Sequence, residues 1–229
     1  APRMRDYIGA VRAVWQAWET ETPIDYHSKH YTLTLTTPNF SPKPMGLPRI
    51  PIAMSAVGPA MLRVAGEVAD GVRLHPFSTR RYLGAVSLQR LQVGLDKTNR
   101  SRSVIDVVAG SFIATGKDEE EVAKMKEYIR FRIAFYCSTK SYWHVLSLHG
   151  MEELGEKLRP YPKEGRWDEM AALIDDETME LFATVATYDE LPGKIEKRYG
   201  GLVDSLSLFI PPHTDVMPLK DVMQDIQRI

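Results

Sequence analysis

The residues best suited to hold a small ligand form one short turn, Ser55, Ala56, Val57 and Gly58. The segment 50–54 before the turn is almost wholly apolar, which is typical of a strand buried on both faces of a parallel sheet. From Pro59 onward, apolar residues recur every three or four positions, which predicts a helix that begins there. Because the first amides and the positive dipole end of a helix attract anions, the turn is a candidate phosphate site. The same small residues also suit a turn that only lets a strand and a helix pack.

A second set of candidates follows the next predicted strand, 71–77. His75 lies near its end, and a histidine there can donate a hydrogen bond or relay a proton, because its ordinary pKa is about 6.5. A structural histidine bonded to a loop carbonyl is the alternative. Ser78 and Arg80 come directly after the strand, although an arginine at a helix start is also common on a solvated surface. His213, after the last predicted strand, faces either the cavity or solvent.

Other reactive side chains point to no further chemistry. Cys137 is the only cysteine, so no intrachain disulfide forms, and without a neighbouring base it is predicted to be a buried, inert thiol. His27 and His30 have only Asp25 as a further ligand nearby, so we predict no metal site. The sequence has no nucleophile elbow, no Gly-x-x-x-x-Gly-Lys loop and no Gly-x-Gly-x-x-Gly motif. These absences argue against a hydrolase, an ATPase and a Rossmann dehydrogenase.

The candidate residues lie at the ends of predicted strands, and these strands alternate with predicted helices along the chain. Four apolar segments are predicted to be strands: 50–54, 71–77, 104–114 and 203–210. Helices between consecutive strands imply right-handed crossovers and a parallel sheet. This α/β pattern alone allows either half of a (β/α)8 barrel or a small doubly wound sheet.

The segments between the strands are predicted to be largely helical. A first amphipathic helix precedes a proline-rich excursion, 19–49, that contains a short edge strand or hairpin. Asp118 and Thr187, each followed three residues later by Glu, are start signals for two helices. Between these two helices, residues 137–186 are predicted to form a helical insertion without a strand, whose last helix ends at Val185.

Length and composition are those of an ordinary globular protein. With 229 residues, 44% of them hydrophobic and 26% charged, the chain has room for one sizeable core, so we expect a single domain, 1–229. A formal net charge of −1 and the lack of long Lys/Arg runs argue against a nucleic-acid or membrane partner. No stretch reaches about 18 apolar residues and the first residues lack a signal-peptide pattern, so we expect a cytoplasmic protein.

The candidate turn belongs to a longer motif that resembles a known family. Residues 51–62 read Pro-Ile-x-x-x-Ala-x-Gly-Pro-x-Met-Leu, and residues 65–71 read Ala-Gly-Glu-x-Ala-Asp-Gly. This run is similar to the signature of the bacterial-luciferase-like superfamily of flavin- and deazaflavin-dependent oxidoreductases. Further segments follow the order that this family shows: Tyr26–Tyr31, Pro38–Pro44, Ala134–Thr139, Leu148–Gly150 and Arg198–Gly201.

The resemblance implies a (β/α)8 TIM-barrel fold of which this chain forms roughly the second half, strands five to eight. The turns that follow the strands would then lie at the C-terminal face, where barrel enzymes have their active sites. The family carries a further half-barrel before this point and the chain begins without Met, so we expect an N-terminal truncation. Because a half-barrel exposes two strand edges, we also expect a homo-oligomer, namely a dimer.

The resemblance also implies roles for the candidate residues. The backbone of Ser55–Gly58 would bind the ribityl-phosphate side of the cofactor. His75 would help to hold the substrate, as in sugar-phosphate-oxidising relatives. The loop with Ser78 and Arg80 would bind anionic substrate groups, and His213 would contribute from the last strand. This loop lacks the lysine that a sugar-phosphate substrate would require, which argues against such a substrate.

The function implied by the resemblance is an oxidoreductase that acts on a small organic substrate. Because the motif is closest to methylenetetrahydromethanopterin-reductase-like members, we expect hydride transfer with the deazaflavin coenzyme F420. An FMN-dependent monooxygenase that uses molecular oxygen is the rival enzyme. A non-catalytic flavoprotein or an inactive half-barrel fragment is the alternative from another class.

Overall fold

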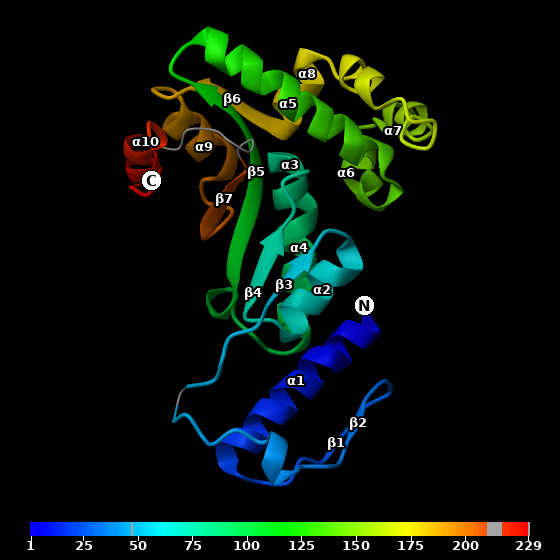
Figure 1. Cartoon of the computed structure of the whole chain (residues 1–229), viewed down its shortest axis with the longest axis vertical. Helices are drawn as coiled ribbons and strands as arrows, with labels where there is room; N and C mark the ends of the chain where they lie inside the picture. Colours follow the sequence, from blue (N-terminus) through cyan, green and yellow to red (C-terminus); the bar gives the residue numbers. More distant parts are fainter. Residues whose placement is uncertain (47, 210–216, 229) are drawn as a thin grey trace. The chain divides into compact units, whose positions relative to one another are not determined.

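The computed structural model describes residues 1–46, 48–209 and 217–228 (Figure 1). The chain divides into two compact units. Unit 1 contains Ala1–Val72 and Gln89–Asp106, and unit 2 contains Arg73–Leu88 and Val107–Ile229. The single domain expected over 1–229 stays a prediction.

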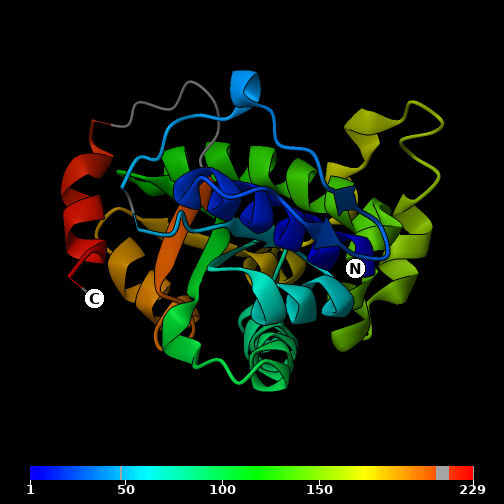
Figure 2. The same ribbon diagram turned by 90° about the horizontal axis from the view of Figure 1, so that it is seen from below.

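Two amphipathic helices form the main part of unit 1. The first, α1, spans Pro2–Thr20 and packs against α2, Pro59–Val68 (Figures 1 and 2). α2 begins at Pro59 as predicted, because a proline at the first helical position lacks only an N–H that would have had no partner. Between these helices, β1, Tyr26–His27, and β2, Thr32–Leu33, form the predicted hairpin as an antiparallel pair.

Asp70, directly after α2, connects three segments of unit 1. Its carboxylate accepts hydrogen bonds from the Ile52 amide at 2.9 Å and from the guanidinium groups of Arg12 and Arg49 at 2.7 Å each. Partial burial alone would raise the pKa of Asp70, but the Ile52 amide and the Arg12 charge hold it below its ordinary value. Asp70 therefore has a structural role in unit 1.

The larger sheet holds most of the predicted strands. Its strands are β3, Ala53–Ala56; β4, Gly71–Leu74; β5, Asp106–Gly116; β6, Ala183–Thr187; and β7, Ser205–Phe209. The hydrogen-bonded order is β3-β4-β5-β6, and β7 also pairs with β5. Within the described residues the sheet is open and does not close into a barrel. The α/β class is thus confirmed, whereas the half-barrel remains a prediction.

β5 is long enough to pair with two parallel strands of unit 2. Its residues 108–112 pair with β7, and its residues 112–116 pair with β6. The prediction that 137–186 contains no strand is therefore wrong at its C-terminal end. Residues 183–187 are a strand because the far half of β5 offers them backbone partners, and the preceding helix ends at Phe182.

Helices cover the sheet strands of unit 2, and the longest is α5, Glu119–Ser138, which packs against β6, α7 and α8 (Figures 1 and 2). The other helices of the chain are α3, Arg80–Tyr82; the π-helix η2, Leu83–Ser87; α4, Leu88–Lys97; α6, Trp143–Leu148; α7, Glu152–Leu158; α8, Asp176–Phe182; α9, Leu191–Tyr199; and α10, Leu219–Ile226. Short 3-10 turns are η1, Pro38–Phe40; η3, Arg102–Val104; η4, Lys140–Tyr142; η5, Trp167–Glu169; and η6, Ala171–Leu173.

The two predicted helix-start signals have different outcomes. The Asp118 carboxylate accepts a hydrogen bond from the Glu121 amide at 3.0 Å, so α5 begins with the expected cap. Thr187 caps no helix, because it is the last residue of β6. α9 begins four residues later, at Leu191, without a side-chain cap.

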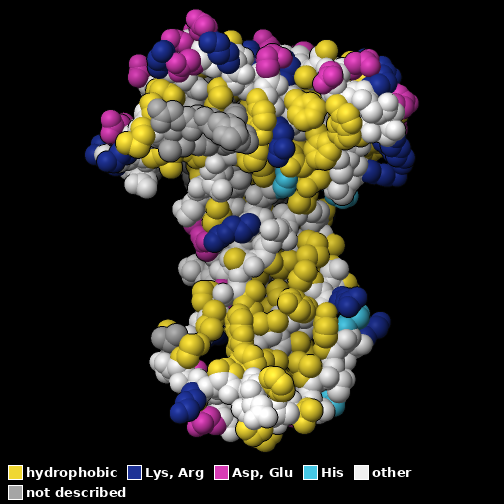
Figure 3. Space-filling model, viewed as in Figure 1, with side chains coloured by type: hydrophobic (Ala, Val, Ile, Leu, Met, Phe, Trp, Pro, Cys, Tyr) yellow, Lys and Arg dark blue, Asp and Glu magenta, His cyan; other side chains and the backbone are white. Residues whose placement is uncertain are grey.

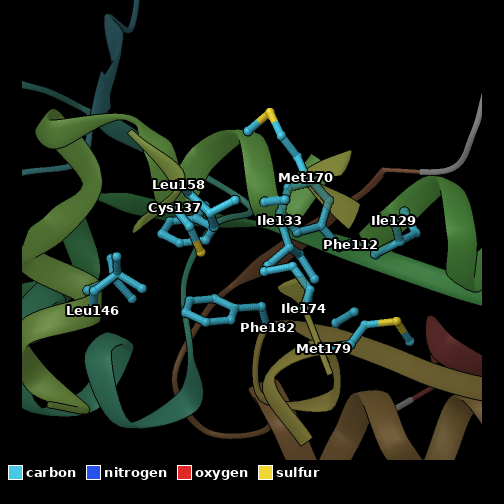
Figure 4. Packing of buried hydrophobic residues seen from close by; sticks show 14 of the residues in the cluster. Phe112, Ile129, Ile133, Cys137, Leu146, Leu158, Met170, Ile174, Met179 and Phe182 are labelled. Atoms are coloured by element: carbon cyan, nitrogen blue, oxygen red, sulfur yellow. The ribbon is translucent and has the colours of Figure 1, made fainter. Parts of the chain in front are cut away.

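The core of unit 2 lies between α5, β5 and the helices of the insertion (Figure 4). Its fully buried side chains include Phe112 of β5, Ile133 of α5 and Phe182 of α8. Rings of Phe77 and Phe182 stack with centroids 4.4 Å apart. The region predicted to be an insertion therefore contributes to the hydrophobic core.

Unit 1 exposes several large apolar side chains, which appear as a yellow surface over its helix and hairpin in Figure 3. The most exposed are Leu35 and Phe40, at 80% and 83% of their full accessible surface. Among the helices that the structure describes, none is long and apolar enough to cross a membrane.

Candidate functional site

The predicted cofactor turn connects β3 to α2 in unit 1. Ser55 is exposed, Ala56 is buried and Val57 is half-buried. Gly58 is the N-cap residue of α2, in an extended backbone conformation with φ −81° and ψ 158°. Its carbonyl oxygen accepts the first helical bond, from the Met61 amide at 3.0 Å. The turn is therefore the strand-to-helix connection that the sequence predicts.

The first turn of α2 has no side-chain cap, a feature that α2 shares with α1, α6 and α9 but not with α3, α5 and α8. Thr79, Asp118 and Asp175 cap α3, α5 and α8 through their side-chain oxygens. In α2, Gly58 has no side chain to act as a cap, and the first turn contains no acidic residue. An anion at this turn would meet the positive end of the helix dipole without a competing carboxylate from the same turn.

His75 lies directly after β4 in unit 2, with its ring against two tyrosines. The ring centroids are 4.5 Å from Tyr136 and 4.7 Å from Tyr142. The Phe77 amide donates a hydrogen bond to Nδ1 at 3.0 Å, so the proton of the neutral ring is on Nε2. No described residue bonds Nε2, and His75 bonds a loop amide rather than the loop carbonyl of the structural alternative.

The surroundings of His75 keep its ring neutral. Burial first, and then the positive charge of Arg132, lower the pKa of His75 from 6.5 to about 4. At neutral pH the side chain is therefore a hydrogen-bond donor without charge. A neutral N–H next to aromatic rings suits the orientation of a substrate oxygen.

Arg132 belongs to the same cluster, and the sequence analysis did not predict it. Its guanidinium carbon lies 4.9 Å from the ring centroid of Phe209 and 5.9 Å from that of Tyr136. Its Nε is buried and has no hydrogen-bond partner. Its position in the sequence could have indicated it as a candidate. Arg132 lies between Ile129 and Tyr136 on a helix face that is otherwise apolar.

Ser78 and Arg80 lie at the start of α3, also in unit 2. The Ser78 hydroxyl is buried without a hydrogen-bond partner. Arg80 is exposed and donates to the carbonyl oxygen of Arg198 at 3.0 Å, so its guanidinium is partly engaged by the backbone. Thr79 bonds His149 at 2.9 Å, and Thr79, Arg80 and His149 line an open groove of about 730 Å³.

The remaining candidates have separate outcomes. Cys137 is buried, as predicted, and burial raises the pKa of its thiol to about 12. His149 ends α6 as its C-cap residue. His213 lies outside the described residues. His27 pairs with Asp25 at 2.9 Å, and no group of three or more metal-ligating side chains is found in the described part of the chain.

Two relatives have sequences similar to that of this chain. An uncharacterized protein of Mycobacterium tuberculosis is 38% identical over 229 residues, which is 100% of this chain and 67% of that protein. The 5,10-methylenetetrahydromethanopterin reductase of Methanopyrus kandleri is 26% identical over 203 residues, covering 86% of this chain and 56% of the reductase. The chain thus spans between about half and two thirds of the length of these relatives.

Two solved structures are similar to this one. The coenzyme F420 dependent tetrahydromethanopterin reductase from Methanopyrus kandleri superposes with a TM-score of 0.66 at 23% identity, over 96% of this chain and 59% of that one. The EDTA monooxygenase from Chelativorans sp. BNC1 gives a TM-score of 0.57 at 14% identity, over 90% of this chain and 49% of that one. Both show that the α/β fold with its parallel sheet is shared.

A family model covers nearly the whole chain. Residues 1–205 match the luciferase-like monooxygenases, and this range includes the β3-α2 turn, His75 and Arg132. The match agrees with the family that the motif around Gly58 resembles. The chain therefore belongs to the luciferase-like monooxygenase family of oxidoreductases.

Proposed function

We propose that this protein is an F420-dependent oxidoreductase that transfers a hydride to or from a small organic substrate. The observation that carries the proposal is the first turn of α2, which has neither a side-chain cap nor an acidic residue where the family motif lies. The similarity to an enzyme named methylenetetrahydromethanopterin reductase favours F420 over FMN. In this proposal β3, β4, β5 and β7 correspond to strands five to eight of a (β/α)8 barrel.

The residues present fit a cofactor with a phosphate group. Gly58 has no Cβ, so nothing at the N-cap position blocks the approach of an anion to the amides. Ser55 is exposed beside the turn, and its hydroxyl is available for a phosphate oxygen. When bound, the deazaflavin would supply the hydride, and the turn of Ser55–Gly58 would fix its phosphate end.

His75 would act on the substrate rather than on the cofactor. Its Nε2–H is a neutral donor, which would orient a substrate oxygen. Ser78, Arg80 and His213 are kept as further substrate-binding residues of the proposal. The aromatic walls Tyr136 and Tyr142 would exclude water from the reacting group.

An FMN-dependent monooxygenase is the second candidate, because an EDTA monooxygenase has a similar fold. A chain without catalytic activity is the candidate from another class. Titration of the purified chain with F420 and, separately, with FMN distinguishes the three. We expect saturable F420 binding by fluorescence. Tight FMN binding without affinity for F420 would replace the proposal by the monooxygenase, and binding of neither would favour the inactive chain.

A variant pair tests whether the turn binds the phosphate. In Gly58→Asp the new carboxylate would cap α2 itself and repel an anion, so we expect at least about 10-fold weaker F420 binding. Gly58→Asn also caps the helix but adds no charge, and it should weaken binding less. Both variants should be as stable as the parent or more stable, by up to about 1 kcal/mol, because Gly58 already has an extended backbone. Unchanged F420 affinity in Gly58→Asp would remove the turn from the site.

A further inference from the structure

Arg132 is a half-buried cation for which the described part of the chain provides no counter-ion. Its Nε is buried and unbonded, and it forms no ion pair or hydrogen bond with any described residue. Two other arginines of unit 2 behave differently. Arg130, on the same helix, pairs with Asp176 and Glu127. Arg198 also has a buried, unbonded Nε, but its terminal nitrogens donate to backbone carbonyl oxygens. The lack of partners at Arg132 is therefore not a general property of arginines in this unit.

Two aromatic rings lie beside Arg132. Its guanidinium lies over the rings of Phe209 and Tyr136. Ring faces accept no hydrogen bond from the buried Nε of this half-buried side chain, so that donor remains unused. An arginine with this environment is better explained if an anion completes its coordination.

A second donor lies in the same cluster. The ring of Tyr136 lies near both Arg132 and His75, and the centroids of the Tyr136 and His75 rings are 4.5 Å apart. Nε2 of His75 carries a proton that no described residue accepts. The cluster thus holds two unused kinds of donor, one charged and one neutral, beside rings that can contact the apolar body of a ligand.

We propose that Arg132 and His75 bind the carboxylate of an organic acid, with Tyr136, Tyr142 and Phe209 against its apolar part. This inference rests on the proposed function, since it names the class of substrate for that site. A carboxylate fits better than a phosphate for two reasons. The planar guanidinium fork matches two carboxylate oxygens, and the cluster offers one positive charge, which neutralises a monoanion but not a dianion.

Benzoate, benzamide and inorganic phosphate are suitable probes, titrated calorimetrically into the chain without cofactor. We expect saturable benzoate binding at least about 10-fold tighter than that of benzamide, which has the same shape without the charge. Phosphate should bind more weakly than benzoate. Equal affinities for benzoate and benzamide, or a preference for phosphate, would overturn the proposal.

Variants separate this site from the cofactor turn. Arg132→Gln should weaken benzoate binding at least about 10-fold, and Arg132→Lys should keep part of the affinity because it keeps the charge but not the fork. Lys124→Gln removes a positive charge from an exposed position of the same helix and should change nothing. F420 binding should persist in Arg132→Lys and in Arg132→Gln, so failure here is distinguishable from failure of the proposed function. If Arg132→Gln does not fold, unaltered benzoate binding by Arg132→Lys counts against the proposal.

Discussion

The pKa of His75 in unit 2 is well below the ordinary value of a histidine. A histidine that keeps its proton in water at pH 6 is held neutral here, because burial and the charge of Arg132 both oppose the imidazolium form. The groups around the ring are Arg132 of α5 and the phenols of Tyr136 and Tyr142. Burial first, and then Tyr136, raise the pKa of Tyr142. Because a phenol that keeps its proton carries no negative charge, Tyr142 does not stabilise a positively charged His75 ring at acid pH.

This shift predicts how stability depends on pH. The folded pKa of about 4 lies below the ordinary value of 6.5, so between these values the unfolded chain binds more protons than the folded one. The free energy of unfolding should therefore fall as the pH drops from about 6.5 to about 4, by roughly 1–2 kcal/mol for this partly exposed group. Urea unfolding at several pH values measures the slope.

A His75→Gln variant provides the comparison, because it keeps a neutral hydrogen-bonding side chain. Its stability should change less than that of the parent between pH 6.5 and pH 4. An NMR titration of the His75 ring protons gives the folded pKa directly. An ordinary pKa for His75 in the folded chain would contradict the expectation and would also remove the neutral donor from the proposed mechanism.

At the level of elements, α2 and α4 of unit 1 approach each other through their backbones. A Cβ at Gly66 would overlap the carbonyl oxygen of Leu91, and a Cβ at Gly94 would overlap that of Arg63. Backbone atoms cannot move aside without displacing a whole helix. The two glycines therefore set the spacing of the helices, and α2 carries the turn that is proposed to bind the cofactor.

Gly66→Ala should consequently destabilise the protein although alanine is the better helix former. The clash should cost about 1–3 kcal/mol or more, which exceeds the roughly 1 kcal/mol that alanine gains in a helix. Gly193→Ala in α9 is the matched control, since a Cβ there meets no atom within 4 Å. It should be neutral or stabilising by up to about 1 kcal/mol in thermal or urea unfolding. Equal stability of the two variants would refute the close approach.

The elements also show what the sequence can predict. Strong local signals, such as Pro59 at a helix start and the Asp118 cap, predicted α2 and α5 correctly. β6 was missed because the segment 176–187 contains no Gly or Pro to mark the change from helix to strand. Its strand conformation depends on hydrogen bonds to β5, about 70 residues earlier, and no local pattern reports such a partner.

The candidate site was predictable only in part for the same reason. The β3-α2 turn is contiguous in sequence, so its composition was sufficient to indicate it. Arg132 and Tyr136 are far from His75 along the chain, and only the packing of α5 brings them together. Arg132 lowers the pKa of His75, and neither the sequence around His75 nor the sequence around Arg132 predicts this effect by itself.

On the scale of the whole molecule, apolar side chains remain in contact with water. Leu35 and Phe40 are 80% and 83% exposed, and the hydrophobic surface of unit 1 is continuous enough to be seen in Figure 3. Exposed apolar area of this kind favours association, because its burial between two molecules removes it from water. The dimer expected from the sequence therefore remains our prediction for the protein in solution.

Sedimentation velocity over a range of concentrations measures this association. We expect a dimer that dissociates on dilution, and we expect Phe40→Ser and Leu35→Ser to weaken it about 10-fold or more without loss of stability, since neither side chain is packed in the monomer. Val104→Ser is the control, because Val104 is also exposed, at 50%, but lies outside the excursion between α1 and β3. A monomer at all concentrations would contradict the dimer. Equal effects of the three variants would show that general surface hydrophobicity, rather than the region around Phe40, drives the association.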